Sequence, residues 1–240
     1  MRKLALIILI PNICFALNFQ EFVEVKEAVE KAFQELKPND QHSLSVNQPV
    51  GDNPYYWWES DMVHASYSGY EQDGAYFHHI FLFGGFVRQQ GMTKDGLAVT
   101  ACHEIGHGIG GAPKKSSGSS MEGQSDYYAT KTCLPIVFKY LKKTEQPELP
   151  YLLDLCAKYN KTDKYCSRSL HALLADQEFF KNHQGAIVDF NQASLVIASE
   201  LNDSPSFYPE PQCRFDTSIH GALQLERPRC WYPQGIERKL

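Results

Sequence analysis

The segment His-Glu-Ile-Gly-His at positions 103–107 contains the residues with the clearest capacity for chemistry. Its two histidines are four positions apart, so on a helix they lie one turn apart on the same face and both imidazoles can reach one metal ion. Glu104 then lies beside that ion, where its carboxylate can accept a proton from a water molecule. Such a pentapeptide occurs by chance in roughly one chain in a hundred of this length. Two histidines on a buried helix face can also be purely structural, so the interpretation depends on a third ligand.

A glutamate on a following helix can supply that third ligand. A catalytic zinc site uses three protein ligands and leaves a fourth position for water. The metzincin pattern would place a histidine at position 113, but the residue there is Pro113, which cannot bind a metal. Glu122 follows His107 by 15 residues, just after a Gly/Ser-rich segment that can reverse the chain. Asp126 lies one turn beyond Glu122 on the same face, from which it can hydrogen-bond the far nitrogen of a ligand histidine, which we expect to be His103.

In these residues the chain resembles the gluzincin metallopeptidases, the thermolysin-like and CAAX-prenyl-protease-like zinc enzymes. The resemblance covers about residues 76–133. It implies one Zn²⁺ per chain, a general base, a partner for a ligand histidine, and an edge strand before the HExxH helix, for which residues 78–83 are placed. The chain lacks the membrane helices of the prenyl proteases, and its second half matches no gluzincin pattern, so the substrate class does not transfer. The implied roles are zinc ligand for His103, His107 and Glu122, general base for Glu104, and outer partner for Asp126.

The expected function is therefore a zinc-dependent metallopeptidase that acts on a peptide or protein substrate. A separate donor normally stabilises the oxyanion in such a reaction. Five residues are candidates, and the sequence does not choose among them: His171, His220, Tyr208, Tyr127 and Arg214.

Two other functions compete with this one. The same site would serve an exported zinc amidase that acts on cell-wall peptides. A binding or assembly protein with a structural zinc or an inactive site is the second alternative. The intact Glu104 argues against the second, because a structural site has no use for a general base.

The N-terminus predicts export. Arg2 and Lys3 precede the apolar run at 4–10, and the small residues Cys14 and Ala16 follow, which is the layout of a secretory signal peptide over residues 1–16. The run is too short to span a bilayer, and no other window approaches 18 apolar residues, so we expect no membrane anchor. The expected location is the periplasm or the extracellular medium.

Cysteine content and charge agree with an exported enzyme. Six cysteines follow the predicted signal peptide, which allows up to three disulfides. Cys156–Cys166 and Cys213–Cys230 are the short-loop pairs we expect. The chain carries 23 Lys+Arg and 28 Asp+Glu, a formal net charge of −5. This excludes a broad basic footprint for nucleic acid, and the sequence leaves the oligomeric state undetermined.

The elements that must position these residues can be read from periodicity. Residues 19–37 predict an amphipathic helix, and 38–54 a polar connector. The segment 17–50 is either a propeptide or a helix packed on the main domain, and its well-formed apolar face favours the packed helix. Residues 51–240 then form the catalytic domain.

Within that domain we expect a strand at 75–83 and a helix at 93–109. On the strand, His78 and His79 point to opposite faces, so they cannot bind one metal together. A second helix should begin near residue 121 and be interrupted by Pro135.

The chain then reads as mostly helical to about 201, followed by a disulfide-stapled loop tail at 202–240. The alternative is that this tail forms a wall of the substrate cleft, where Arg214 or Arg227 would bind a substrate carboxylate. The expected fold is α+β: a mostly helical, zincin-like domain with a small sheet or edge strand over the active-site helix.

Overall fold

The computed structural model describes residues 16–144, 146–161 and 165–234. Nearly all of the predicted signal peptide therefore lies outside the described residues. The described chain is mostly helical, with one small sheet, which is an α+β arrangement.

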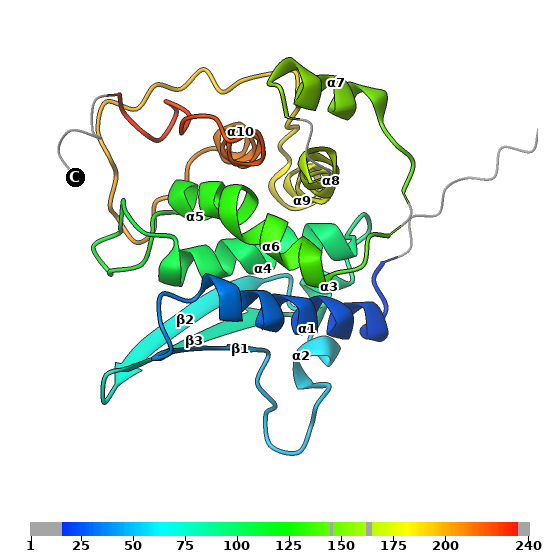
Figure 1. The fold of residues 1–240 in the computed structure, drawn as a ribbon, viewed down its shortest axis with the longest axis vertical. Helices are drawn as coiled ribbons and strands as arrows, with labels where there is room; N and C mark the ends of the chain where they lie inside the picture. Colours follow the sequence, from blue (N-terminus) through cyan, green and yellow to red (C-terminus); the bar gives the residue numbers. More distant parts are fainter. Residues whose placement is uncertain (1–15, 145, 162–164, 235–240) are drawn as a thin grey trace, which may run out of the picture.

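A mixed three-stranded sheet forms one layer of the molecule (Figure 1). Its central strand is β3 (Ala75–Leu82), which pairs antiparallel with β2 (Ala65–Gln72) and parallel with β1 (His42–Val46). Asp73 and Gly74 join β2 to β3 with φ of 53° and 77°, the positive values that a type I′ hairpin turn requires. The short helices α2 (Tyr56–Glu59) and α3 (Gly84–Val87) flank this hairpin in the chain.

The sheet corrects two expectations. The strand expected at the edge, over 78–83, belongs to β3 and lies in the middle of the sheet, so the edge strand beside the HExxH helix is β2. The connector at 38–54 contains β1, which was expected to be loop. Its serines alternate with Leu44 and Val46, and this strand is too short and too polar for its period of two to stand out.

The first helix, α1 (Phe19–Leu36), begins with a capping box. Asn18 Oδ1 accepts a hydrogen bond from the Glu21 amide at 3.0 Å, and the Glu21 carboxylate accepts one from the Asn18 amide at 2.9 Å. Its apolar face, including Phe22, Val25 and Phe33, is buried against β1 and two other helices. This is the arrangement expected of a helix packed on the main domain.

Helix α4 (Lys94–Ile109) carries the HExxH segment through the centre of the molecule. Thr93 caps its start, because the hydroxyl accepts a hydrogen bond from the Gly96 amide at 3.0 Å. It packs against β2 and β3 on one side and against α5 (Glu122–Tyr128) on another. Almost every residue from 95 to 106 is buried, so α4 is a core helix rather than a surface helix.

The helical segment that begins with α5 is longer than predicted. A π-helical turn, η1 (Ala129–Cys133), joins α5 to α6 (Leu134–Tyr140). Pro135, expected to interrupt or end the helix, is the second residue of α6. The wide π turn directly before it accommodates a residue that has no amide hydrogen to donate.

Four further helices lie on the side of α4 and α5 away from the sheet (Figure 1). Helical structure was expected to about residue 201, but α9 ends at Gln184, where Gly185 turns the chain with a φ of 64°. Residues 186–210 contain neither helix nor strand. The tail, expected to be loop, contains α10, because Pro209 and Pro211 lie at a helix start, where proline is favoured. These four helices are α7 (Pro150–Lys158), α8 (Cys166–Ala172), α9 (Leu174–Gln184) and α10 (Pro211–Ala222).

Three disulfides connect these elements. Cys156–Cys166 and Cys213–Cys230 confirm the two expected short-loop pairs, and Cys102–Cys133 joins α4 to η1. Three disulfides indicate that the protein folds in an oxidising, extracellular environment. Among the described residues, no helix has both the length and the apolarity needed to cross a membrane.

Candidate metal centre

The crossing of α4 and α5 brings three metal-binding side chains together. His103, His107 and Glu122 each offer a ligand atom, and these atoms all lie within 4.8 Å of one another. The helices can approach this closely because residue 106 is glycine: a Cβ there would lie only 2.9 Å from Ser125 Cα on α5. The absence of one side chain thus places two imidazoles of one helix against a carboxylate of the next.

The hydrogen bonds of His107 fix which of its nitrogens faces the group. Its Nδ1 lies 3.0 Å from the Ser120 carbonyl oxygen, which can only accept, so we assign the proton to Nδ1. Burial lowers the pKa of His107 to about 4, so the ring is neutral. The lone pair of Nε2 is therefore directed toward Glu122 Oε1, 3.5 Å away.

Glu122 contributes a buried carboxylate to the group. The side chain is 2% exposed, and its Oε1 lies 2.6 Å from the Lys115 ammonium. Burial alone would raise the pKa of this carboxyl, but the contacts with His103 and Arg214 hold it well below its usual range. Oε2 lies 3.3 Å from His103 Nε2 and 3.8 Å from Arg214 Nη2, and within the described chain no hydrogen bond of regular geometry reaches it. An ionised carboxylate oxygen buried against imidazole nitrogens fits a bound cation.

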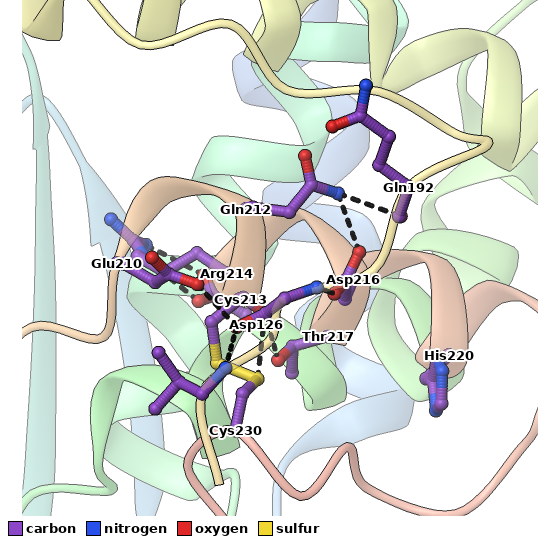
Figure 2. Close-up of a disulfide and its surroundings, with 12 residues drawn as sticks. Asp126, Gln192, Glu210, Gln212, Cys213, Arg214, Asp216, Thr217, His220 and Cys230 are labelled. Atoms are coloured by element: carbon purple, nitrogen blue, oxygen red, sulfur yellow. Dashed lines mark hydrogen bonds and ion pairs between the residues drawn. A yellow bond between two sulfur atoms is a disulfide. The ribbon is translucent and has the colours of Figure 1, made fainter.

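Asp126 and Arg214 form an ion-pair chain behind His103. Asp126 Oδ1 lies 2.7 Å from His103 Nδ1, the length of a charge-assisted contact, and the two groups form an ion pair. Figure 2 shows Arg214, from α10, reaching Asp126, to which its Nε and Nη2 donate at 2.9 and 2.7 Å. Burial opposes a charge on His103, but the Asp126 carboxylate outweighs it and raises the pKa of His103 to about 10. The site thus favours a positive charge at this imidazole.

Glu104 lies beside the ligand group and lines the same cleft. Its side chain is buried, and in the described part of the chain no group hydrogen-bonds it or pairs with it. Burial raises the pKa of Glu104 to about 7, with the positive charge on His103 acting in the opposite direction. A carboxylate so placed can accept and return protons near neutral pH.

The cleft around these groups has a volume of about 490 Å³. Residues 63–67, at the start of the edge strand β2, form one wall. Tyr208, which precedes α10, and Lys115, in the loop before α5, also line it. A groove bordered by a strand edge can admit an extended chain.

The structure places some of the five candidate oxyanion donors in the cleft and the others elsewhere. Tyr208 and Arg214 line the cleft. His171 borders a separate small pocket, whereas the side chains of His220 and Tyr127 contact the carbonyl oxygens of Glu226 and Leu225. Arg227, the alternative for meeting a substrate carboxylate, donates to Gln124 Oε1 and does not line the cleft.

Sequence reasoning did not single out Lys115, which the structure places in the cleft. Its ammonium contacts both Glu122 and the ring of Tyr208, 5.4 Å from the ring centroid. The lysine lies in the Gly/Ser-rich segment, which was interpreted only as a chain reversal. Only its position could have indicated this placement, because a loop that reverses the chain brings its residues close to the helix that follows.

His78 and His79 point to opposite faces of β3. His78 Nδ1 lies 2.9 Å from the Tyr67 hydroxyl and its Nε2 lies 2.9 Å from His42 Nδ1. His79 contacts Ser45 instead. These contacts form a hydrogen-bonded chain from the cleft wall at Tyr67 to the partly exposed His42.

Comparison of the chain with protein-family models, with curated proteins and with solved structures finds no match in any of the three.

Proposed function

We propose that this chain is an exported zinc-dependent metallopeptidase that hydrolyses peptide bonds with Glu104 as the general base. The observation that carries the proposal is the convergence of His103, His107 and the buried carboxylate of Glu122, whose ligand atoms all lie within 4.8 Å of one another. Two imidazoles and one carboxylate form the ligand set of many catalytic zinc sites, whereas Ca²⁺ and Mg²⁺ prefer oxygen ligands alone. The resemblance to the gluzincins supports the same assignment.

His103, His107 and Glu122 would hold the ion. When bound, Zn²⁺ supplies Lewis acidity, which lowers the pKa of a water molecule toward about 7 and polarises a carbonyl group. Glu104 takes the proton from the attacking water and delivers it to the leaving amine. Its position in the cleft, free of hydrogen bonds from the described residues, and its raised pKa suit it to both transfers.

Asp126 and Arg214 orient the imidazole of His103. The two-pronged contact of Arg214 holds the Asp126 carboxylate in place, and the carboxylate in turn holds His103 Nδ1. This leaves Nε2 directed toward Glu122 and the cleft. An anchored carboxylate behind a ligand histidine also raises its basicity toward a metal.

Tyr208 is the donor we assign to the developing oxyanion. Arg214 lines the cleft too, but two of its nitrogens are already engaged by Asp126. The Tyr208 hydroxyl lies against Glu122: after the larger effect of burial, the charge of that carboxylate and a hydrogen bond to it raise the pKa of Tyr208. A hydroxyl at this position donates where negative charge appears.

A peptide substrate fits the cleft wall. The outer edge of β2 is free of a strand partner within the described sheet, and residues at its start line the cleft. Unpaired backbone groups at a strand edge bind extended peptides by adding a strand. This supports peptide-bond hydrolysis over chemistry on a small compact molecule.

Metal content and turnover test the proposal together. We expect about one zinc per wild-type chain by elemental analysis and far less in Glu122→Gln, which keeps the shape of the side chain but loses its charge. Glu104→Gln should retain zinc and lose at least about 1000-fold in peptide hydrolysis, because only proton transfer is removed. Glu178→Gln, on the exposed side of α9, serves as the matched control and should change neither value. No zinc in the wild-type protein after refolding with metal, or full activity of Glu104→Gln, would refute the proposal.

A further inference from the structure

The wall that α9 contributes to the cleft combines aromatic rings with a carboxylate. Asp176, Phe179 and Phe180 all line the cleft from this helix. Phe86 of α3 joins them, with its ring centroid 5.6 Å from that of Phe179. The spacing of Asp176, Phe179 and Phe180 places the acidic group and two rings on the same face of α9.

Asp176 has no partner within the described residues. Its carboxylate makes no hydrogen bond and no ion pair there, although it faces the cleft. The cleft cations are already engaged: Arg214 binds Asp126 through two nitrogens, and Lys115 binds Glu122. Apart from Glu104, Asp176 is therefore the carboxylate in this cleft that forms no ion pair within the described chain, although the charges of Arg214 and His103 act on it from a distance.

The position of Asp176 is fixed by close packing of its helix. The preceding residue, Ala175, lies against Gly96 at the start of α4, where an added Cβ would be 2.4 Å from the Ala175 Cβ. Because α4 also carries His103 and His107, this packing fixes the position of the Asp176 carboxylate relative to the ligand group. A charge held this way can select among substrates.

We propose that Asp176 and the surrounding phenylalanine rings form the subsite that selects the substrate by binding a positively charged group next to the scissile bond. The group is an alkylammonium or guanidinium, supplied by a lysine or arginine side chain or by the free amino terminus of a peptide. The inference rests on the proposed function for the cleavage step, whereas the binding of the cation does not depend on it.

Elementary energetics favour a cation here. A carboxylate forms its strongest contacts with charged donors, and aromatic faces attract cations held close to them. The methylene groups of a lysine or arginine can pack along the phenylalanine rings while the charged end reaches the acid. Burial, and then the Asp126 carboxylate, raise the pKa of Asp176 to about 7, so a bound cation supplies the charge that keeps it ionised.

A purely structural role is the competing explanation. Asp176 lies in the first turn of α9, where a negative charge stabilises the positive end of the helix. That role predicts a loss of stability on neutralisation, but no change in ligand preference. The two explanations therefore differ in what they predict for a neutral, isosteric replacement.

Binding to the Glu104→Gln protein, which should not turn over its ligands, tests the subsite directly. Acetylated pentapeptide amides of alanine would carry lysine, norleucine or glutamate at the centre, and their affinities would be measured by calorimetry. Norleucine has nearly the same stem as lysine but no charge. We expect lysine to bind at least about 10-fold more tightly than norleucine, and glutamate to bind most weakly.

Asp176→Asn in the same background should abolish most of this preference. The lysine peptide should lose about 10-fold in affinity, and the norleucine peptide should change by less than about 2-fold. Glu178→Gln removes the same charge from the same helix outside the cleft and should leave the preference intact. Thermal unfolding of both variants separates a change in selectivity from a loss of folding.

Non-acetylated alanine peptides distinguish the two sources of the cation. Tighter binding of the free-amine alanine peptide than of its acetylated form, lost in Asp176→Asn, assigns the subsite to the amino terminus. A preference limited to acetylated lysine peptides assigns it to side chains. Equal affinities for lysine and norleucine in the Asp176 protein, or the same preference in Asp176→Asn, would overturn the inference.

Turnover of the same peptides separates this inference from the proposed function. Cleavage of lysine and norleucine peptides at equal rates would contradict the subsite and leave the peptidase intact. Selective binding without any hydrolysis by the wild-type, zinc-loaded protein would contradict the peptidase and leave the cation subsite intact.

Discussion

At the scale of single residues, the site is defined by which polar atoms have partners. Each ligand histidine is held at Nδ1, one by the Ser120 carbonyl and the other by the Asp126 carboxylate. Arg214, which lies 88 positions after Asp126 in the chain, holds that carboxylate in place from α10. The outer contacts are therefore as much part of the candidate metal centre as the three residues that would bind the ion.

Removing the carboxylate behind His103 should weaken metal binding. Asp126→Ala frees the imidazole to rotate and leaves Arg214, a cation, with Glu122 as its remaining ion-pair partner close to the ligand group. We expect the affinity for Zn²⁺ to fall by ~10–100-fold, measured by competition with a chromophoric chelator. The exposed Asp203 offers a control, since Asp203→Ala should have no effect. Unchanged affinity in Asp126→Ala would show that this carboxylate does not orient the ligand.

At the scale of elements, the two halves of the site are joined covalently. Cys102 is adjacent to the ligand His103 on α4, and Cys133 ends the π turn that follows α5. The pair therefore fixes the crossing at which the imidazoles meet Glu122. Its sequence separation of 31 residues is the longest of the three disulfides.

Replacing both cysteines by alanine should cost stability and metal affinity together. Loss of a cross-link over 31 residues is worth about 4 kcal/mol of unfolding free energy in the chain-entropy description. The double variant Cys156→Ala/Cys166→Ala, whose disulfide spans 10 residues away from the site, should cost about 3 kcal/mol and leave zinc affinity unchanged. Urea unfolding and chelator competition measure the two effects. Equal zinc affinity in both double variants would contradict the role of Cys102–Cys133 in the site.

The sheet should make the protein sensitive to acid through His78. Burial lowers the pKa of His78 to about 4, from an ordinary value near 6.5. Between these values the unfolded chain binds a proton at this residue and the folded chain does not, so the unfolding free energy falls as the pH drops from about 6.5 to about 4. The contribution is on the order of 3 kcal/mol at most.

His78→Gln keeps a side chain that can hydrogen-bond Tyr67 and His42 but does not titrate in this range. Its unfolding free energy should therefore decline less between pH 7 and pH 4.5 than that of the wild-type protein. The exposed His183 provides a matched control, and His183→Gln should decline like the wild type. Parallel curves for wild type and His78→Gln would show that this histidine is not responsible.

At the scale of the whole molecule, a bound ion should act as a structural clamp as well as a reagent. Glu122, Asp126 and Glu104 bring buried negative charge to the junction of several helices. Saturation with a ligand at 1000 times its dissociation constant adds about 4 kcal/mol to the unfolding free energy. We expect Zn²⁺ to raise the melting temperature of the chelator-treated protein by about 10 °C. Ca²⁺ should not do so, and an equal shift in Glu122→Gln would place the ion elsewhere.

Local spacing accounts for what could be predicted from the sequence. The helix carrying His103 and His107, and the helix carrying Glu122 and Asp126, follow from periodicity and from glycines at their ends. The pairing of close cysteines follows from their small separation. Each of these features depends on residues that lie within a few tens of positions of one another in the sequence.

Long-range packing decided the rest. Nothing local to β1 indicates that it pairs with β3, and this pairing moved the expected edge strand to the centre of the sheet. Helix α10 was not predicted, because the prolines around its start were interpreted as a sign of a loop. The partnership of Arg214 with Asp126 depends on that helix crossing α5, which no spacing along the chain encodes.

The disulfide between α4 and η1 would also restrict the proposed activity to one compartment. A chain still in the reducing interior of the producing cell lacks the bond that sets its two ligand-bearing helices in register. If the proposed activity holds, the peptidase would gain its full metal affinity only after it has left this reducing compartment, so the proteins there would not be exposed to its activity.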